Sequence, residues 1–380
     1  MALKVARRGQ IPPFIVMDVM RAAAERAAAG KDVIHLEVGQ PSTGAPQGVI
    51  RAAHAALDAQ PLGYTLAFGN EPLRQRIATH YKERYGVTVP AERIAVTVGS
   101  SGAFLLGFLA AFEPGDRVGI AAPGYPCYRH ILTALNVESV TIPIDASTGF
   151  KLTVEALNGI ENLDGLIVAS PSNPTGGVLS AVEMKALIAW CKQRGVRLVS
   201  DEIYHGITYG TAATTAADAP EVITINSFSK YFSMTGWRLG WMVLPPDLSR
   251  PVEVLAQNMF ISPPTLAQVA GLAAFDCKDE LDANVARYAR NRAILLNELP
   301  GAGFDHFAPA DGAFYVYTDV SRYTNDAEAF CRRLLAETGV ACTPGVDFDP
   351  IEGRRFMRLA YPGTEAEMVE AAKRLKAWKK

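Results

Sequence analysis

The segment Leu163–Gly206 reads LDGLIVASPSNPTGGVLSAVEMKALIAWCKQRGVRLVSDEIYHG and predicts a strand, a helix and a second strand. Its run GLIVAS is short and continuously apolar, as in strands that are buried on both faces. Ser180, followed three residues later by Glu183, predicts a helix start with a capping box, and Gly195 predicts the helix end. The run VRLVS predicts the next strand. A unit of this kind is typical of a parallel sheet.

The same alternation extends on both sides of this segment. Before it come RIAVTVG (93–99), which leads into a predicted helix, and DRVGIAAPG (116–124). After it come EVITINS (221–227) and WRLGWMVLP (237–245). Strands that alternate with helices predict an α/β fold with a mostly parallel, doubly wound sheet.

The pattern changes near residue 275. Ala-, Arg- and Glu-rich helical patterns then alternate with the short predicted strands GAFYVYTDV and RFMRLAYP. We therefore expect a large domain over residues 46–275 and a smaller α+β domain over 276–380. Residues 1–45 are expected to form an arm that joins the small domain.

Composition argues against several partner classes. The 380 residues carry a net charge of −2, which gives no electrostatic reason to expect nucleic acid or an anionic membrane as a partner. The longest apolar run, Ala103–Phe112, is too short to span a bilayer. The N-terminus lacks the apolar region of a secretory signal. The 5 cysteines show no CxxC spacing, which favours free thiols in a reducing cytoplasm.

Motifs for metals and nucleotides are missing as well. The 6 histidines show neither HExxH nor another zinc-like spacing, so no metal site is expected. The sequence contains neither GxxxxGK[ST] nor GxGxxG, the usual signatures of nucleotide-phosphate and dinucleotide binding.

Polar residues gather where the predicted strands end. Ligands of open α/β sheets bind at the carboxyl ends of the strands, so these residues predict one site. They are Ser100 and Ser101, Tyr125, Asn173, Asp201, and Ser227 with Lys230.

Lys230 stands alone in the apolar stretch SFSKYFSMTGWRLGW, and the next charge is Arg238. In a dry setting a lysine has a lowered pKa and can form a Schiff base with a carbonyl. An ordinary loop lysine with its charge in solvent is the alternative. Asp201 can likewise be a helix cap or the partner of a pyridinium nitrogen. A magnesium-binding acid, as in P-loop enzymes, is excluded because the sequence has no phosphate loop.

Other strand-end residues also allow two interpretations each. Ser100 and Ser101 can bind a phosphate at a helix N-terminus or form a simple turn. Tyr125 can stack on a ring or pack in a turn, and Asn173 is by default a turn residue. Arg358, flanked by apolar residues, can face water on an edge strand or bind a carboxylate through both guanidinium nitrogens.

In this order and spacing, the signals resemble the class I and II aminotransferases, enzymes of fold type I that use pyridoxal 5'-phosphate (PLP). The resemblance runs from HLEVGQPSTGAP to the C-terminus and is most specific in SPSNPTGG, LVSDEIY and SFSKYFSMTGWRLGW. It implies the aspartate aminotransferase fold, with a mostly parallel seven-stranded sheet in the large domain. It also implies a homodimer.

The resemblance assigns roles to single residues. Lys230 matches the lysine that holds PLP as a Schiff base, and Lys230, Asp201 and Tyr204 are the expected catalytic residues. Asp201 matches the partner of the ring nitrogen, Tyr125 the stacking aromatic, and Asn173 and Tyr204 the donors to the phenolic oxygen. The expected phosphate contacts are Ser100, Ser101, Ser227, Arg238 and, from the neighbouring subunit, Tyr64. The expected substrate contacts are Gly39, Asn173, Arg358 and Phe14.

The implied reaction moves an amino group between an L-amino acid and a 2-oxo acid, such as 2-oxoglutarate, in a ping-pong cycle. The phosphate turn from Ser100 to Gly102 carries no basic residue, unlike that of some dicarboxylate-specific members. Ile11, Pro13 and Phe14 are expected to form an apolar wall that suits aromatic or aliphatic side chains.

Two other functions fit the same motifs. A PLP-dependent C–S β-lyase shares them and differs in its products, ammonia and pyruvate. A PLP-sensing regulatory module would need a DNA-binding domain, and only about 40 weakly basic residues precede the match.

Overall fold

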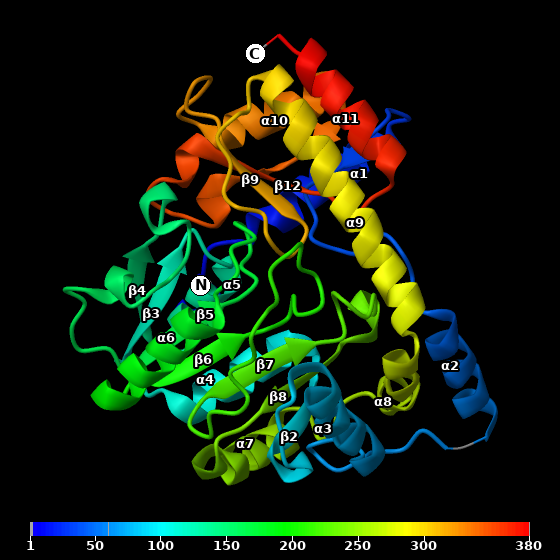
Figure 1. Ribbon diagram of the computed structural model, residues 1–380, viewed down its shortest axis with the longest axis vertical. Helices are drawn as coiled ribbons and strands as arrows, with labels where there is room; N and C mark the ends of the chain where they lie inside the picture. Colours follow the sequence, from blue (N-terminus) through cyan, green and yellow to red (C-terminus); the bar gives the residue numbers. More distant parts are fainter. Residues whose placement is uncertain (1–2, 60, 380) are drawn as a thin grey trace.

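The computed structural model describes residues 3–59 and 61–379. Its largest element is a seven-stranded sheet with the strand order β2-β8-β7-β6-β5-β3-β4 (Figure 1). β8 runs antiparallel to β2 and β7, whereas the other pairs are parallel, so the predicted α/β fold with a mostly parallel sheet is confirmed. The strands are Ile94–Val98 (β2), Arg117–Ala122 (β3), Glu138–Pro143 (β4), Gly165–Ala169 (β5), Arg197–Asp201 (β6), Ile223–Ser227 (β7) and Leu239–Val243 (β8).

The antiparallel β8 follows from the length of its connection. Residues 228–238 link β7 to β8 with no α-helix between them. A parallel pair needs a longer crossover, usually through a helix, so the chain turns back at the carboxyl end of β7. Lys230 lies in this connection, directly beside the edge at which the parallel strands end.

The central strands are buried on both faces, as their continuous apolar runs predict. Ile167 and Val199 belong to one buried hydrophobic cluster together with Phe104 of α4 (Gly99–Ala111). Their neighbours Leu166 and Leu198 belong to a second cluster, which includes residues of α6 (Ala181–Arg194). Alternate side chains of β5 and β6 therefore pack in opposite directions, with α4 on one face and α6 on the other.

Helix α6 begins and ends as the sequence predicts. The Ser180 hydroxyl accepts a hydrogen bond from the Glu183 N–H at 3.2 Å, and the Glu183 carboxylate accepts one from the Ser180 N–H at 2.6 Å. Gly195 ends the helix with a φ of 68°, a conformation that glycine adopts without strain.

The remaining α-helices are Ile15–Ala28 (α1), Gln47–Ala59 (α2), Glu71–Tyr85 (α3), Pro126–Ala134 (α5), Pro246–Met259 (α7), Thr265–Leu272 (α8), Lys278–Glu298 (α9), Ala327–Thr338 (α10) and Glu365–Ala377 (α11). No helix in the described ranges is both long and apolar enough to cross a lipid bilayer.

The C-terminal part contains a three-stranded antiparallel sheet in the order β11-β12-β9. Its strands are Tyr315–Asp319 (β9), Thr343–Pro344 (β11) and Phe356–Ala360 (β12). The N-terminal strand β1 (Ile34–His35) pairs in parallel with β10 (Val340–Ala341), and α1 packs against β10 and β11. The N-terminal segment thus packs against the C-terminal part.

Candidate active site

Lys230 lies at the carboxyl edge of the large sheet, half-buried. Its Nζ donates a hydrogen bond to the Gly39 carbonyl at 2.7 Å and lies 5.7 Å from the centroid of the Tyr204 ring. Burial, reinforced by the charges of Arg358 and Arg238, lowers the pKa of Lys230 to about 8. The alternative of an ordinary solvent-facing loop lysine does not fit these surroundings.

Asp201 ends β6 and is buried. One carboxylate oxygen accepts a hydrogen bond from the Tyr128 hydroxyl, and the other accepts one from the Ile203 N–H at 3.0 Å. Burial raises the pKa of Asp201 to about 6. A turn rather than a helix follows β6, so the interpretation of Asp201 as a helix cap is wrong.

The first turn of α4 lies beside Arg238. Ser100 and Ser101 lie in this turn, and no side chain caps it. Gly99 has a φ of +66°, and a Cβ built there would lie 2.6 Å from Nη2 of Arg238. The guanidinium group of Arg238 therefore covers the N-terminus of the helix, where free N–H groups and the helix dipole favour an anion.

Ser227 is buried at the end of β7. Its hydroxyl lies 3.0 Å from the Ser229 hydroxyl and 3.4 Å from the Leu239 carbonyl. These contacts hold the Ser227 side chain inside the connection that carries Lys230.

Arg358 lies on β12, the central strand of its sheet, and only 1% of its surface is exposed. The alternative of a water-facing arginine on an edge strand is therefore wrong. Its Nη1 donates to Oδ1 of Asn173 at 2.9 Å, and its Nη2 donates to the Glu37 carbonyl. The guanidinium carbon lies 4.3 Å from the Tyr315 ring centroid and 4.6 Å from that of Phe348.

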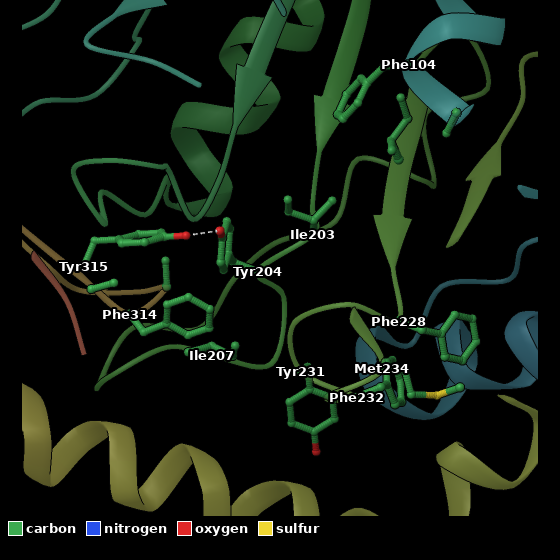
Figure 2. Close-up of a cluster of buried hydrophobic side chains, with 14 of the residues drawn as sticks. Phe104, Ile203, Tyr204, Ile207, Phe228, Tyr231, Phe232, Met234, Phe314 and Tyr315 are labelled. Carbon is green, nitrogen blue, oxygen red and sulfur yellow. Dashed lines mark hydrogen bonds between the residues drawn. The ribbon is translucent and has the colours of Figure 1, made fainter. Parts of the chain in front are cut away.

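Tyr315, which was not predicted from the sequence, contacts the predicted site residues Tyr204, Gly39 and Arg358. Its hydroxyl lies 2.5 Å from the Tyr204 hydroxyl, and Figure 2 shows the two groups pointing toward one another. A Cβ at Gly39 would lie 1.8 Å from the Tyr315 hydroxyl oxygen. Only glycine fits at position 39 with this placement of Tyr315.

Aromatic rings line the side of the site near α1. The rings of Phe14 and Tyr125 meet edge to face with centroids 5.9 Å apart, and Tyr125 lies 5.2 Å from Tyr128 in the same way. Ile11 and Pro13 are exposed. Of the three residues predicted for the apolar wall, the structure brings Phe14 against the site's aromatic rings.

Tyr64 lies apart from this cluster within the chain. It occupies the connection between α2 and α3, and it is 82% exposed. The described residues show no hydrogen bond or ring contact between Tyr64 and the strand-end residues.

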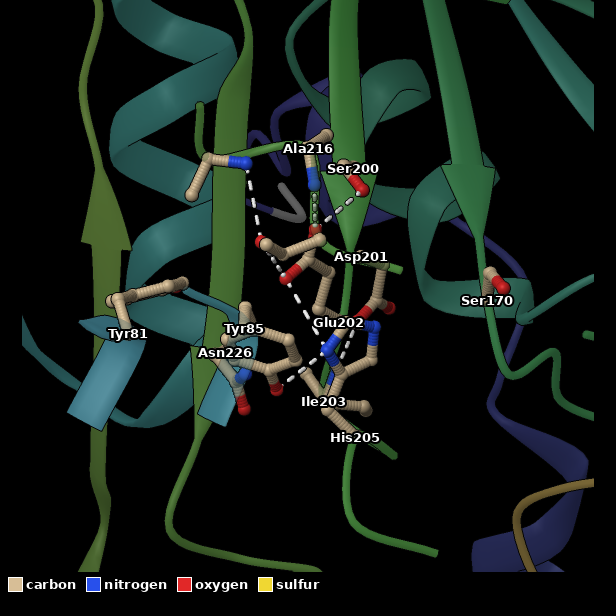
Figure 3. A network of polar contacts seen from close by, with 12 residues as sticks. Tyr81, Tyr85, Ser170, Ser200, Asp201, Glu202, Ile203, His205, Ala216 and Asn226 are labelled. Carbon is tan, nitrogen blue, oxygen red and sulfur yellow. Dashed lines mark hydrogen bonds and ion pairs between the residues drawn. The ribbon is translucent and has the colours of Figure 1, made fainter. Parts of the chain in front are cut away.

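A buried polar network supports the turn after Asp201 (Figure 3). The Glu202 carboxylate accepts hydrogen bonds from the Ala216 N–H at 2.7 Å and the Thr215 hydroxyl at 2.8 Å. Nδ1 of His205 lies 3.4 Å from Glu202 and 2.8 Å from the Tyr85 hydroxyl. Burial raises the pKa of Glu202 to about 8 and lowers that of His205 to about 3.

The sequence analysis missed Tyr128, Tyr315 and the residues of this network. Tyr128 appears in the motif APGYPCY, two predicted strands away from Asp201. No spacing rule indicates such contacts, because they depend on how distant segments meet. The described residues contain no group of three or more His, Cys, Asp or Glu side chains that could hold a metal ion.

Comparison with known proteins agrees with this geometry. A family model for class I and II aminotransferases matches residues 31–375. A valine–pyruvate aminotransferase of Mycobacterium tuberculosis is 49% identical, with 99% of this chain and 98% of that protein covered. An aspartate aminotransferase of Sulfurisphaera tokodaii is 32% identical, with 96% and 93% covered.

Solved structures show the same similarity. The crystal structure of an aminotransferase from Mycobacterium tuberculosis has a TM-score of 0.97 and 48% identity, with 99% of both chains covered. Aspartate aminotransferase from Thermus thermophilus with maleate has a TM-score of 0.93 and 31% identity, with 99% of this chain and 100% of that chain covered. The predicted aminotransferase activity and aspartate aminotransferase-like fold are thereby confirmed, and the chain belongs to the class I and II aminotransferases.

Proposed function

We propose that this aminotransferase binds PLP, the cofactor of its family, at the carboxyl edge of the large sheet, with Lys230 as its covalent attachment point. The observation that carries the proposal is the meeting of three complementary groups at this edge. They are an amine with a lowered pKa (Lys230), a buried carboxylate (Asp201), and an uncapped helix N-terminus beside Arg238.

These groups fit the parts of the cofactor. Asp201 would pair with the ring nitrogen, which gives the buried carboxylate a cationic partner. Ser100, Ser101, Ser227 and Arg238 would bind the phosphate, and Tyr125 would cover the ring. Asn173 and Tyr204 would donate to the phenolic oxygen. When bound, PLP supplies a protonated ring that draws electrons away from the amine-bearing carbon of the substrate.

The chain's own residues would carry out the proton transfer. The lowered pKa of about 8 makes the Lys230 amine available as a base near neutral pH, so that it can remove the proton from the substrate Cα and return a proton later. Arg358 would bind the substrate carboxylate together with Gly39 and Asn173. In a ping-pong cycle, the same residues serve both the amino acid and the 2-oxo acid.

The surroundings of the site favour apolar donors over dicarboxylates. Phe14 and Tyr125 provide aromatic surface, and Phe348 packs against Arg358. The valine–pyruvate specificity in the name of one relative points in the same direction. We therefore propose amino acids with aliphatic side chains as donors and pyruvate, rather than 2-oxoglutarate, as the preferred acceptor.

A homodimer is part of the proposal. Tyr64 and Leu66 are 82% and 74% exposed, and Met259 and Ile261 are 47% and 51% exposed. The two segments lie together, because the Thr65 N–H donates to the Ser262 hydroxyl at 3.4 Å. An exposed apolar patch of this kind favours a protein partner. A second copy would cover it and bring Tyr64 to the phosphate of the neighbouring site.

The free cysteines suit a reducing compartment, and we propose the cytoplasm.

A screen of single half-reactions tests the proposed function. Protein loaded with PLP is mixed with one amino acid at a time, and the absorbance of the cofactor is followed without any 2-oxo acid. Valine should convert the cofactor to its amine form faster than aspartate, and pyruvate should reverse the change. Preference for aspartate, or release of ammonia and pyruvate from cysteine conjugates as the main reaction, would refute the proposal.

A further inference from the structure

The side chains of His35 and Glu37 form a pair at the segment whose backbone carbonyl Arg358 contacts. The Glu37 side chain has no exposed surface, whereas 48% of the His35 side chain is exposed. Nδ1 of His35 lies 2.8 Å from Oε1 of Glu37, and Oε2 of Glu37 has no hydrogen-bond partner among the described residues. A buried carboxylate without a cationic partner is costly, and protonated His35 is the counter-charge that this contact offers to Glu37.

The backbone of Glu37 connects this pair to the site. Its carbonyl accepts hydrogen bonds from Nη2 of Arg358 and, at 2.9 Å, from the Thr343 hydroxyl. Two residues later, the Gly39 carbonyl accepts the hydrogen bond from Lys230. Any displacement of Glu37 therefore moves an acceptor of Arg358 and reaches the segment that contacts Lys230.

The charges around His35 and Glu37 determine the pH range in which His35 is protonated and paired with Glu37. Glu37 acts on His35 most strongly, and Glu367 of α11 adds a smaller attraction. From the C-terminal part, the Cys342 thiol lies close enough to Glu37 for the Glu37 charge to help raise the pKa of the thiol, whereas Arg358 contacts the Glu37 backbone carbonyl. The hydrogen bond to Glu37 raises the pKa of His35 above its ordinary value of 6.5. The pairing is therefore complete below pH 6.5 and is lost as the pH rises through the raised pKa.

We propose that His35 and Glu37 are positioning residues for the substrate carboxylate: charged His35 neutralises Glu37 and so fixes the Glu37 carbonyl that orients Arg358. This inference rests on the proposed role of Arg358. When His35 is neutral, the Glu37 carboxylate is buried without a counter-charge and its segment shifts. The affinity for all carboxylate substrates then falls, whatever their side chains. The turnover rate kcat of substrate that is already bound changes little.

The experiment compares three variants of the PLP-loaded enzyme with the wild type. His35→Gln removes the positive charge of His35. Glu37→Gln replaces the buried carboxylate with a neutral amide, which needs no counter-charge. His306→Gln is the matched control, because His306 also lies beside an acid, Asp305 at 3.8 Å, but is 84% exposed. KM and kcat for one amino donor are measured between about pH 5.5 and 9, and the His35 pKa is measured independently by NMR.

In the wild type, KM should rise by at least about fivefold as the pH passes the measured pKa of His35. His35→Gln should show the high KM at every pH, whereas Glu37→Gln should show the low KM at every pH. His306→Gln should keep the wild-type profile. The positioning role is overturned if His35→Gln retains the wild-type dependence of KM on pH. If that variant also has a lower Tm, the pair contributes only to the stability of the fold.

Arg358→Lys separates this inference from the proposed function. If that variant leaves KM unchanged, the role of Arg358 fails and the positioning role fails with it. If Arg358→Lys raises KM while the wild-type KM stays constant across the pKa of His35, the positioning role alone is overturned.

Discussion

Nη1 of Arg358 donates a hydrogen bond to Oδ1 of Asn173 at 2.9 Å, which joins the C-terminal sheet to the carboxyl edge of the large sheet. Both side chains are buried, so the arginine is held in one orientation before any substrate arrives. A group fixed in this way can bind a carboxylate without first losing conformational freedom.

Replacement of Arg358 by lysine tests this orientation. Lysine keeps the charge but not the planar pair of donors, so Arg358→Lys should weaken every amino-acid and oxo-acid substrate alike. Complete removal, in Arg358→Ala, should cost about 2–5 kcal/mol of substrate binding. KM values for several donors measure the effect, with the exposed Arg354→Lys as control. A loss confined to one class of side chain would instead place Arg358 in the side-chain pocket.

Asp201→Asn should lower kcat by about 10²–10⁴-fold, because an amide cannot keep the ring nitrogen protonated. The exposed Asp218→Asn serves as control. Wild-type turnover in Asp201→Asn would show that Asp201 only supports the turn through Ile203.

The same variant should change the pH dependence of stability. Burial raises the pKa of Asp201 from 3.8 to about 6, so the folded, cofactor-free protein binds this proton more tightly than the unfolded chain. The free energy of unfolding therefore decreases as the pH rises through this interval. Denaturant unfolding of cofactor-free Asp201→Asn should show a smaller decrease than the wild type. Identical slopes would mean that Asp201 titrates normally.

Phe14→Ala should reduce kcat/KM for valine and larger apolar donors by about tenfold, because the side chain of the bound donor loses its contact with the Phe14 ring. Alanine as donor should be affected less. Val5→Ala is a suitable control, since Val5 lies in the same N-terminal segment and is 68% exposed. An equal loss for all donors would assign Phe14 a structural rather than a selective role.

Tyr64→Phe should weaken PLP binding by about 1.5–3 kcal/mol without unfolding the protein, because one hydrogen bond to a charged group is lost. Leu66→Glu places a charge in the same exposed apolar patch and should shift the protein toward monomers in sedimentation. A fully active monomer would contradict both the shared site and the role of Tyr64.

The sequence predicts the central fold well, because β5, α6 and β6 carry local signals. Their apolar runs, the capping box at Ser180 and the glycine at 195 need no knowledge of the rest of the chain. β4 (138–143) was missed, because this edge strand is only partly buried and lacks a continuous apolar run. The domain bounds at residues 46 and 276 remain a prediction.

The site was predictable only in part, for a related reason. Lys230, Asp201 and Asn173 follow strands and belong to specific motifs, so their positions at the carboxyl edge of the sheet can be predicted from the adjacent sequence. Tyr315 and Glu37 contact the site from segments far away in the chain, and no local sequence pattern reveals such contacts. The role of Tyr64 concerns a second subunit and stays a prediction.

The central claim is that Lys230 is the residue that carries the cofactor. Protein loaded with PLP is reduced with borohydride, which fixes the pyridoxyl group on the lysine that holds it, and the peptides are then mapped by mass. We predict the modification on Lys230 and none on the exposed Lys185. Lys230→Ala should bind PLP without a reducible link to any lysine. A pyridoxyl group on another lysine of the wild-type protein would contradict the account.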